Sequence, residues 1–206
     1  MARIVKKPEE RRREIIESAR RLFQTKEYDN TTMQDVIDEL KIAKGTIYYY
    51  FKSKEELLEA VVETMVDEDI ASKRLLLKGI SGNALDKFRL LQKMNSLSEE
   101  NKEILEHLHQ PGNIGMHTRL LAVTITKEAP LYADIIHQGC EEGLFETNSP
   151  LEAAEFLLSG IQFLTDLGIY SWKKEDLMRR VQSFPSLIEA LLKAPQDSFR
   201  FLIEDI

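Results

Sequence analysis

A short stretch between residues 44 and 50 combines side chains that can contact the edges of nucleic-acid bases. It reads KGTIYYY and offers an ammonium group, hydroxyl groups and flat apolar edges at neighbouring positions. Ile47 is expected to face a core, while Gly45 lets the backbone approach a base or a phosphate closely. The major groove of DNA accepts one α-helix of this size. The stretch therefore predicts a short helix that contacts DNA with its outer face.

A second interpretation of the same stretch remains open. Three consecutive tyrosines, Tyr48 to Tyr50, could belong to a core or to a protein interface. On a helix of seven residues, however, three adjacent aromatic side chains cannot all face inward. The alternative function is thus a helical protein-interaction module that uses the tyrosine-rich face to bind protein rather than DNA.

The neighbouring segments are expected to hold this helix in place. A first helix is predicted over about 9–26 from an apolar stripe at helical spacing. Thr32 is a good N-cap for a second helix over 33–40, with Asp35 near its positive end. Ser53 and Glu56 form a capping box that begins a long helix over 54–78. Residues 1–54 are also net basic although the whole chain carries −7, an asymmetry typical of a DNA-binding module on an acidic body.

The rest of the chain shows helical patterns and no convincing strand. We expect helices over 84–108, 114–127, 130–142, 150–170, 174–194 and 196–204. Gly143 occupies a position typical of a left-handed helix cap, and Ser149 with Glu152 forms a second capping box. The predicted fold is all-α, with an N-terminal three-helix helix-turn-helix DNA-binding domain (1–53) and a larger helical domain for ligand binding and dimerisation (54–206).

Several other functions are not expected from the sequence. His107 and His109 are two positions apart on a helix and point away from each other, so we expect no metal and no cofactor. No nucleophile elbow, P-loop or dinucleotide fingerprint is present, which argues against an enzyme. No apolar run reaches the length of a membrane span, and the N-terminus lacks a secretory apolar region. A single cysteine, Cys140, fits a cytoplasmic protein, and its default role is a small buried hydrophobe.

The segment 9–58 resembles the TetR family of bacterial transcriptional regulators. The resemblance rests on Ala19, Leu22 and Phe23, on the pair of threonines at 31–32, and on the string KGTIYYYFKSKEELL. It implies that Thr32 and Gln34 touch the DNA backbone or a base, and that Tyr50 and Lys54 touch phosphates. The reading contacts implied for the short helix are Lys44, Gly45, Thr46, Tyr48 and Tyr49. The family usually has glycine in the turn where this chain has Lys41, and a left-handed lysine costs on the order of 1 kcal/mol.

The resemblance also implies an all-helical body that binds a small effector and dimerises through its last long helices. A seven-residue reading helix makes few contacts alone, whereas two copies on a two-fold axis read a palindrome. We place the homodimer interface on helices 150–170 and 174–194 and expect a ligand-released repressor of double-stranded operator DNA. Candidate effector contacts, where the helices of the body converge, are Phe88, Leu91, Met94, His117, Leu121, Phe156 and Phe163.

Overall fold

A computed structural model describes residues 7–94, 102–110 and 113–204. These residues fold into helices, and no strand occurs in the described ranges, which confirms the predicted all-α class. The chain divides into two compact units, one made of residues 1–65 and 98–116 and the other of residues 66–97 and 117–206. The predicted functional boundary between residues 53 and 54 stays a prediction. None of the helices in the described ranges has the length and apolar character needed to cross a bilayer.

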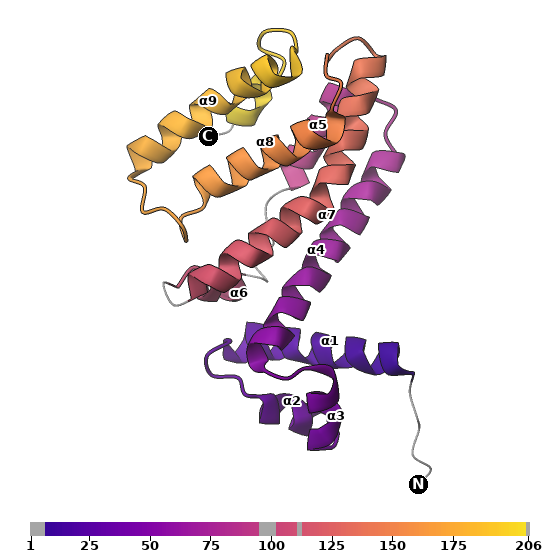
Figure 1. Ribbon diagram of the computed structural model, residues 1–206, viewed down its shortest axis with the longest axis vertical. Coiled ribbons are helices and arrows are strands. Elements are labelled where there is room, and N and C mark those ends of the chain that lie inside the picture. The colour runs from indigo at the N-terminus through magenta and orange to yellow at the C-terminus, as the bar shows by residue number, and fades with distance from the viewer. Residues whose placement is uncertain (1–6, 95–101, 111–112, 205–206) are drawn as a thin grey trace. The chain divides into compact units, whose positions relative to one another are not determined.

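The first unit is built on three helices at the start of the chain. They are α1 (Pro8–Lys26), α2 (Met33–Leu40) and α3 (Lys44–Tyr50), with bounds close to those predicted from sequence. They gather around the first turns of α4 (Lys54–Lys78), as Figure 1 shows. The short helix α6 (Lys102–Leu108) packs on α1 in the same unit. The shared core is apolar and fully enclosed, and it includes Ile15, Phe23, Val36, Ile47, Phe51, Leu57 and Leu58.

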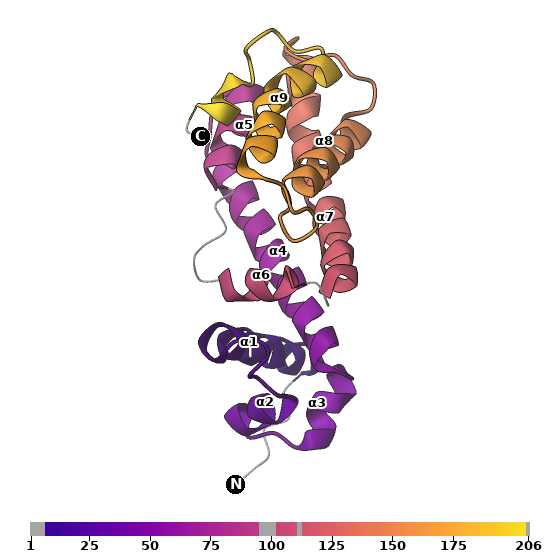
Figure 2. The ribbon, with the colours of Figure 1, turned by 90° about the vertical axis from the view of Figure 1, so that its left-hand side faces the viewer.

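The second unit contains α5 (Ala84–Met94), most of α7 (Ile114–Glu141), α8 (Pro150–Thr165), α9 (Lys174–Leu192) and a 3-10 turn, η3 (Arg200–Ile203). Helices α8 and α9 lie side by side, as their contacts and Figure 2 agree. Aromatic rings hold the base of this core, where the Phe199 ring lies 5.2 Å from Phe88 and 5.8 Å from Phe145. Gly139 permits this packing, because a Cβ there would meet the Phe145 ring at 2.1 Å.

Pro130 does not separate two helices, as the sequence predicted, but lies inside the single helix α7. Proline lacks the N–H that would bond to the carbonyl four residues earlier, so a break was the local expectation. The helix continues because its apolar face is buried on both sides of the proline, at Leu120 and Leu121 and again at Ile135 and Ile136. Burial of that continuous face outweighs the one missing hydrogen bond.

Several other predicted helix ends and caps differ from the structure. Helix α8 ends at Thr165 rather than 170, because the Asp166 carboxylate accepts hydrogen bonds from the amides of Gly168 (2.8 Å) and Ile169 (3.0 Å). The Ser149 side chain makes no capping bond, which makes that predicted capping box wrong. The predicted helix 84–108 appears as α5 and α6, and residues 95–101 between them lie outside the described ranges. The last predicted helix is reduced to η3, while Gly143 has the predicted left-handed φ of 71°.

Candidate nucleic-acid interface and effector cavity

The start of α2 is fixed by a reciprocal pair of hydrogen bonds. The Asp35 amide donates to Thr32 Oγ1 at 3.2 Å, and the Thr32 amide donates to Asp35 Oδ2 at 2.7 Å. The Lys26 ammonium lies 2.7 Å from the other Asp35 oxygen. The bonds from Lys26 and Thr32 lower the pKa of Asp35 to about 2. Thr32 thus begins the helix as predicted, with an exposed side chain beside Gln34, which is also exposed.

Lys41 makes the turn between α2 and α3. Its φ of 53° and ψ of 43° are left-handed, which is the conformation expected in a turn where the family usually has glycine. The Lys41 amide donates to the Asp38 carbonyl, and the Ile42 amide donates to the Ile37 carbonyl at 3.1 Å. These bonds end α2 at the point where the chain must change direction.

Helix α3 has one buried anchor and an open outer face. Ile47 is fully buried, whereas Lys44, Gly45 and Tyr49 are exposed, with Tyr49 at 73%. Apart from its chain neighbours and the backbone of its own helix, no atom lies within 4 Å of where a Gly45 side chain would begin, so the backbone there is open to a partner. Tyr48 is 36% exposed, with the Lys44 ammonium 5.7 Å from its ring centre. Thr46 and Tyr50 are half-buried at the edges of this face.

Two lysines after α3 are engaged within the first unit. The Lys52 ammonium donates to the Tyr48 carbonyl at 2.7 Å and so caps the end of α3. The Lys54 ammonium donates to the carbonyls of Tyr28 (2.9 Å) and Thr31 (3.0 Å). An ammonium group has three N–H donors. The Lys54 ammonium therefore has one N–H donor left for a phosphate, and that contact stays a prediction.

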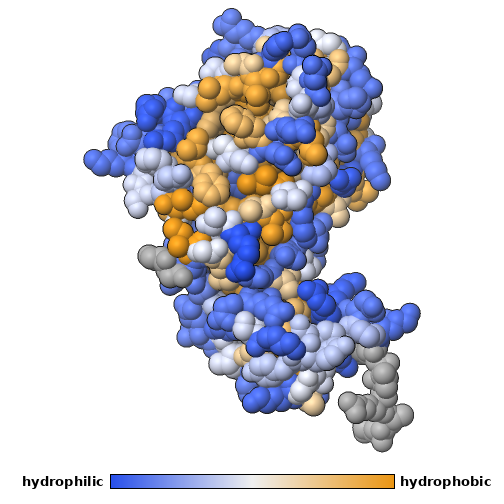
Figure 3. Space-filling view, viewed as in Figure 1, coloured by the Kyte–Doolittle hydropathy of each residue, from blue (hydrophilic) through white to orange (hydrophobic). Residues whose placement is uncertain are grey.

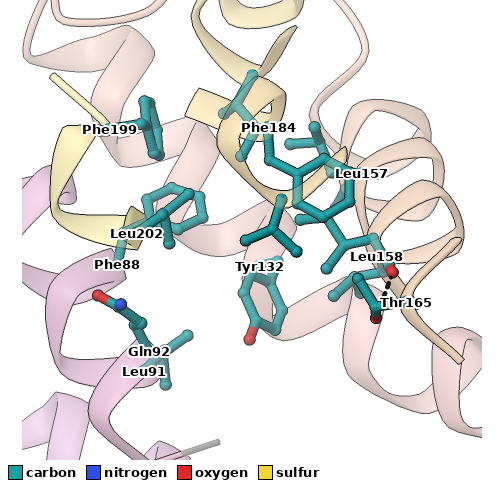
Figure 4. A pocket seen from close by; sticks show the side chains of 14 residues that line it. Phe88, Leu91, Gln92, Tyr132, Leu157, Leu158, Thr165, Phe184, Phe199 and Leu202 are labelled. Carbon is teal, nitrogen blue, oxygen red and sulfur yellow. Dashed lines mark hydrogen bonds between the residues drawn. The ribbon is translucent and has the colours of Figure 1, made fainter. Parts of the chain in front are cut away.

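The second unit contains an apolar cavity of about 260 Å³ that is partly open at its edge (Figure 4). Of the predicted effector contacts, Phe88 and Leu91 line it. Met94, His117, Leu121, Phe156 and Phe163 are not among its lining residues. His117 is buried with its Nε2 atom 3.1 Å from Asp166, and Phe156 points outward at 70% exposure. A ligand contact by any of these five stays a prediction without support from the cavity.

Sequence reasoning missed the part of the cavity wall that comes from the C-terminus. Helix α9 contributes Val181, Phe184 and Ile188, and the η3 region contributes Phe199 and Leu202. Their apolar spacing indicates a buried face, but spacing within one segment does not tell which distant helix that face meets. Tyr132 of α7, which lies next to the buried residue Leu131, was also missed.

An apolar surface lies over α8 and α9, where Figure 3 shows hydrophobic residues gathered on the visible face. The exposed large apolar side chains on these helices are Leu151, Phe156, Leu164, Leu187 and Leu191. An exposed apolar patch such as the one in Figure 3 is typical of a protein interface. We call this set of five residues the α8–α9 face.

Together, the capped α2, the left-handed turn and the open α3 define a DNA-binding helix-turn-helix protein. Two family models match the chain: residues 15–61 match bacterial regulatory proteins of the tetR family, and residues 96–187 match a tetracyclin repressor-like C-terminal domain. The chain belongs to the TetR family of bacterial regulators. Membership favours DNA binding over the protein-interaction alternative.

Individual relatives resemble different lengths of the chain. The HTH-type transcriptional regulator YfiR of Bacillus subtilis is 39% identical over 62 residues, which is 30% of each chain. The transcriptional repressor KstR2 of Mycobacterium tuberculosis is 22% identical over 149 residues, covering 70% of this chain and 74% of KstR2.

Solved structures share the fold over nearly the whole chain. A TetR-family regulator from Pectobacterium atrosepticum has a TM-score of 0.63 at 20% identity, covering 92% of this chain and 97% of that one. RolR in complex with resorcinol has a TM-score of 0.66 at 18% identity, covering 96% and 95%. At these identities the likeness concerns the fold.

Proposed function

We propose that the chain is a ligand-released repressor that binds a palindromic operator as a homodimer. The observation that carries the proposal is α3, which is anchored by the fully buried Ile47 and presents Lys44, Gly45 and Tyr49 to solvent. One relative described above, KstR2, is a transcriptional repressor, which supports this sign of regulation.

The residues of α3 divide by the contact that each can make. Lys44, Thr46, Tyr48 and Tyr49 offer hydrogen bonds and apolar edges to bases, and Gly45 allows close approach of the backbone. Thr32 and Gln34 lie at the start of α2, where amide groups and side chains suit the DNA backbone. Tyr50 and Lys54 are assigned to phosphates, which position the protein without reading sequence.

The α8–α9 face is the proposed dimer interface. Phe156 at 70% and Leu187 at 59% exposure lie on the two helices that the sequence assigned to dimerisation. Burying such side chains stabilises association by roughly 1.5–3 kcal/mol each before the entropy cost of binding. Two copies related by a two-fold axis would present two α3 helices to half-sites about 34–36 Å apart.

The apolar cavity is the proposed effector site, and RolR, a protein of the same fold, is seen with resorcinol bound. Tyr132 lines the cavity from α7, and Glu128 lies one turn earlier on the same helix. The Glu128 carboxylate lies 2.7 Å from the ammonium of Lys73 on α4. Burial opposes the charge of Lys73, but Glu128 and Asp69 raise its pKa, so the ion pair is intact at neutral pH.

This ion pair is the proposed means by which ligand binding in the cavity affects the DNA-binding helices. Lys73 is only 3% exposed, and α4 continues without a break from residues of the first unit to residues of the second. A ligand that binds preferentially when α7 holds the position in which the chain has low affinity for its operator would shift the population of chains toward release from DNA.

The proposal is tested by selecting duplexes from a random-sequence library with the full chain. The selected site should be an inverted repeat bound by two chains, as measured by sedimentation with labelled DNA. An asymmetric site bound by one chain, or selection of no sequence, would overturn the proposal.

A further inference from the structure

The chemistry of the cavity wall restricts which molecules the cavity accepts. No Asp, Glu, Lys, Arg or His of the described chain is among the lining residues. The wall is formed by aliphatic and aromatic side chains, with Gln92, Tyr132 and Thr165 as its polar members. A charged group placed here would lose its hydration without gaining a partner of opposite charge, which is strongly unfavourable.

The hydrogen-bonding groups on the wall are partly committed. The Thr165 hydroxyl donates to the Ile161 carbonyl at 2.8 Å, and the Gln92 amide nitrogen donates to the Phe201 carbonyl at 3.1 Å. Within the described residues, Gln92 Oε1 accepts no hydrogen bond. Figure 4 places Gln92 and Thr165 at opposite sides of the view, with Tyr132 and Phe184 between them. The wall thus offers a carboxamide acceptor at one edge of a hydrocarbon surface.

The size and ring content of the cavity add a further restriction. An apolar cavity of roughly 150 Å³ accepts benzene, and this one measures about 260 Å³. The Phe88 ring lies 5.2 Å from Phe199 at 74° and 6.0 Å from Tyr132 at 50°. Rings at these angles present both edges and faces, which suits a flat ligand of one to two rings.

We infer that the effector is an uncharged, compact, mainly hydrocarbon molecule that carries one hydrogen-bond donor, and that this donor binds Gln92 Oε1. The assignment rests on the proposed function of the cavity as the effector site. It excludes carboxylates, phosphates and ammonium compounds as effectors bound inside this cavity.

Four naphthalene probes of nearly equal size separate these possibilities at pH 7. They are 1-naphthol, naphthalene, 1-naphthoate and 1-naphthylmethylammonium, and their binding to the full chain is measured by calorimetry without DNA. Naphthol should bind roughly two- to tenfold more tightly than naphthalene, the usual range for one hydrogen bond. Both charged probes should bind at least about a hundredfold more weakly than naphthol.

Variants locate the binding. Gln92→Leu should reduce naphthol binding to the level of naphthalene and leave naphthalene binding unchanged. Leu158→Trp should fill the cavity and abolish binding of both neutral probes, whereas Leu75→Trp, at a 73% exposed position on α4, should change neither. Thermal unfolding tests whether each variant is folded. The comparison of the four probes on the unaltered chain does not depend on any variant.

The outcomes separate this inference from the proposed function. Charged probes that bind within about threefold of naphthol, or the failure of both neutral probes to bind, would overturn the ligand class. Equal binding of naphthol and naphthalene would overturn the role of Gln92. If naphthol binds as expected but a saturated protein holds its selected DNA as tightly as before, ligand release fails while the ligand class stands.

Discussion

Lys54 and Tyr28 are joined twice in the first unit. The Lys54 ammonium donates to the Tyr28 carbonyl oxygen at 2.9 Å and also lies 4.0 Å from the centre of the Tyr28 ring. Lys54 begins α4 and Tyr28 follows α1, so this pair fastens the connection between α1 and α2 to the first turn of α4. Lys54, which was predicted to contact a DNA phosphate, therefore also supports the fold of the first unit.

Lys54→Ala should destabilise the chain by about 1–3 kcal/mol, because the carbonyls of Tyr28 and Thr31 lose their donor. Urea unfolding measures the change in the free energy of unfolding. Lys78→Ala, at an exposed position near the end of the same helix, is the matched control and should stay within about 0.5 kcal/mol. Equal effects of the two variants would contradict the structural role of Lys54.

Asp35→Asn should weaken the start of α2 by about 1 kcal/mol at neutral pH. The bonds from Lys26 and Thr32 lower the pKa of Asp35 to about 2, below its unfolded value of 3.8. The carboxylate therefore stabilises the folded state above about pH 4, and this contribution is lost as the pH falls toward 2. Unfolding curves at several pH values should show the two proteins converging in acid. A constant difference across this range would rule out the linkage.

His107 predicts a second pH dependence in the first unit. Its ring lies 3.9 Å from that of Tyr28, and burial lowers its pKa although Asp29 opposes the shift. The unfolded chain then takes up the proton first, so stability falls as the pH drops below about 6.5. The stability difference between the unaltered chain and His107→Gln should shrink between pH 7.5 and 5.5. His137→Gln, at an exposed site, serves as the control, and a difference that grows in acid would reverse the assignment.

Phe156→Glu should convert the proposed dimer to a monomer, because it places a charge at the most exposed apolar side chain of the α8–α9 face. Sedimentation velocity over a range of concentrations measures the shift. Leu75→Glu changes an equally exposed apolar residue outside that face and should leave the assembly intact. A dimer that survives Phe156→Glu but dissociates with Leu75→Glu would move the interface to α4.

Local sequence signals predicted the first unit well and the second less well. Caps such as Thr32 and the left-handed Lys41 act on their own helix ends, so they could be read residue by residue. Pro130 and the cavity wall depend on partners far along the chain. The helix survives Pro130 because of tertiary burial, and Phe199 reaches the cavity only because η3 packs on α5. Phe156 was predicted as an effector contact, but it lies on a helix predicted to dimerise, and its outward position supports only the dimer interface.

Tyr48→Ala shows whether α3 reads base sequence. The measurement is the ratio of affinities for the selected operator and for a random duplex of equal length, at one salt concentration. Tyr48→Ala should lower this ratio by about tenfold or more, while Tyr170→Ala, in the second unit, should leave it unchanged. An unchanged ratio for Tyr48→Ala would show that this side chain of α3 does not read base sequence.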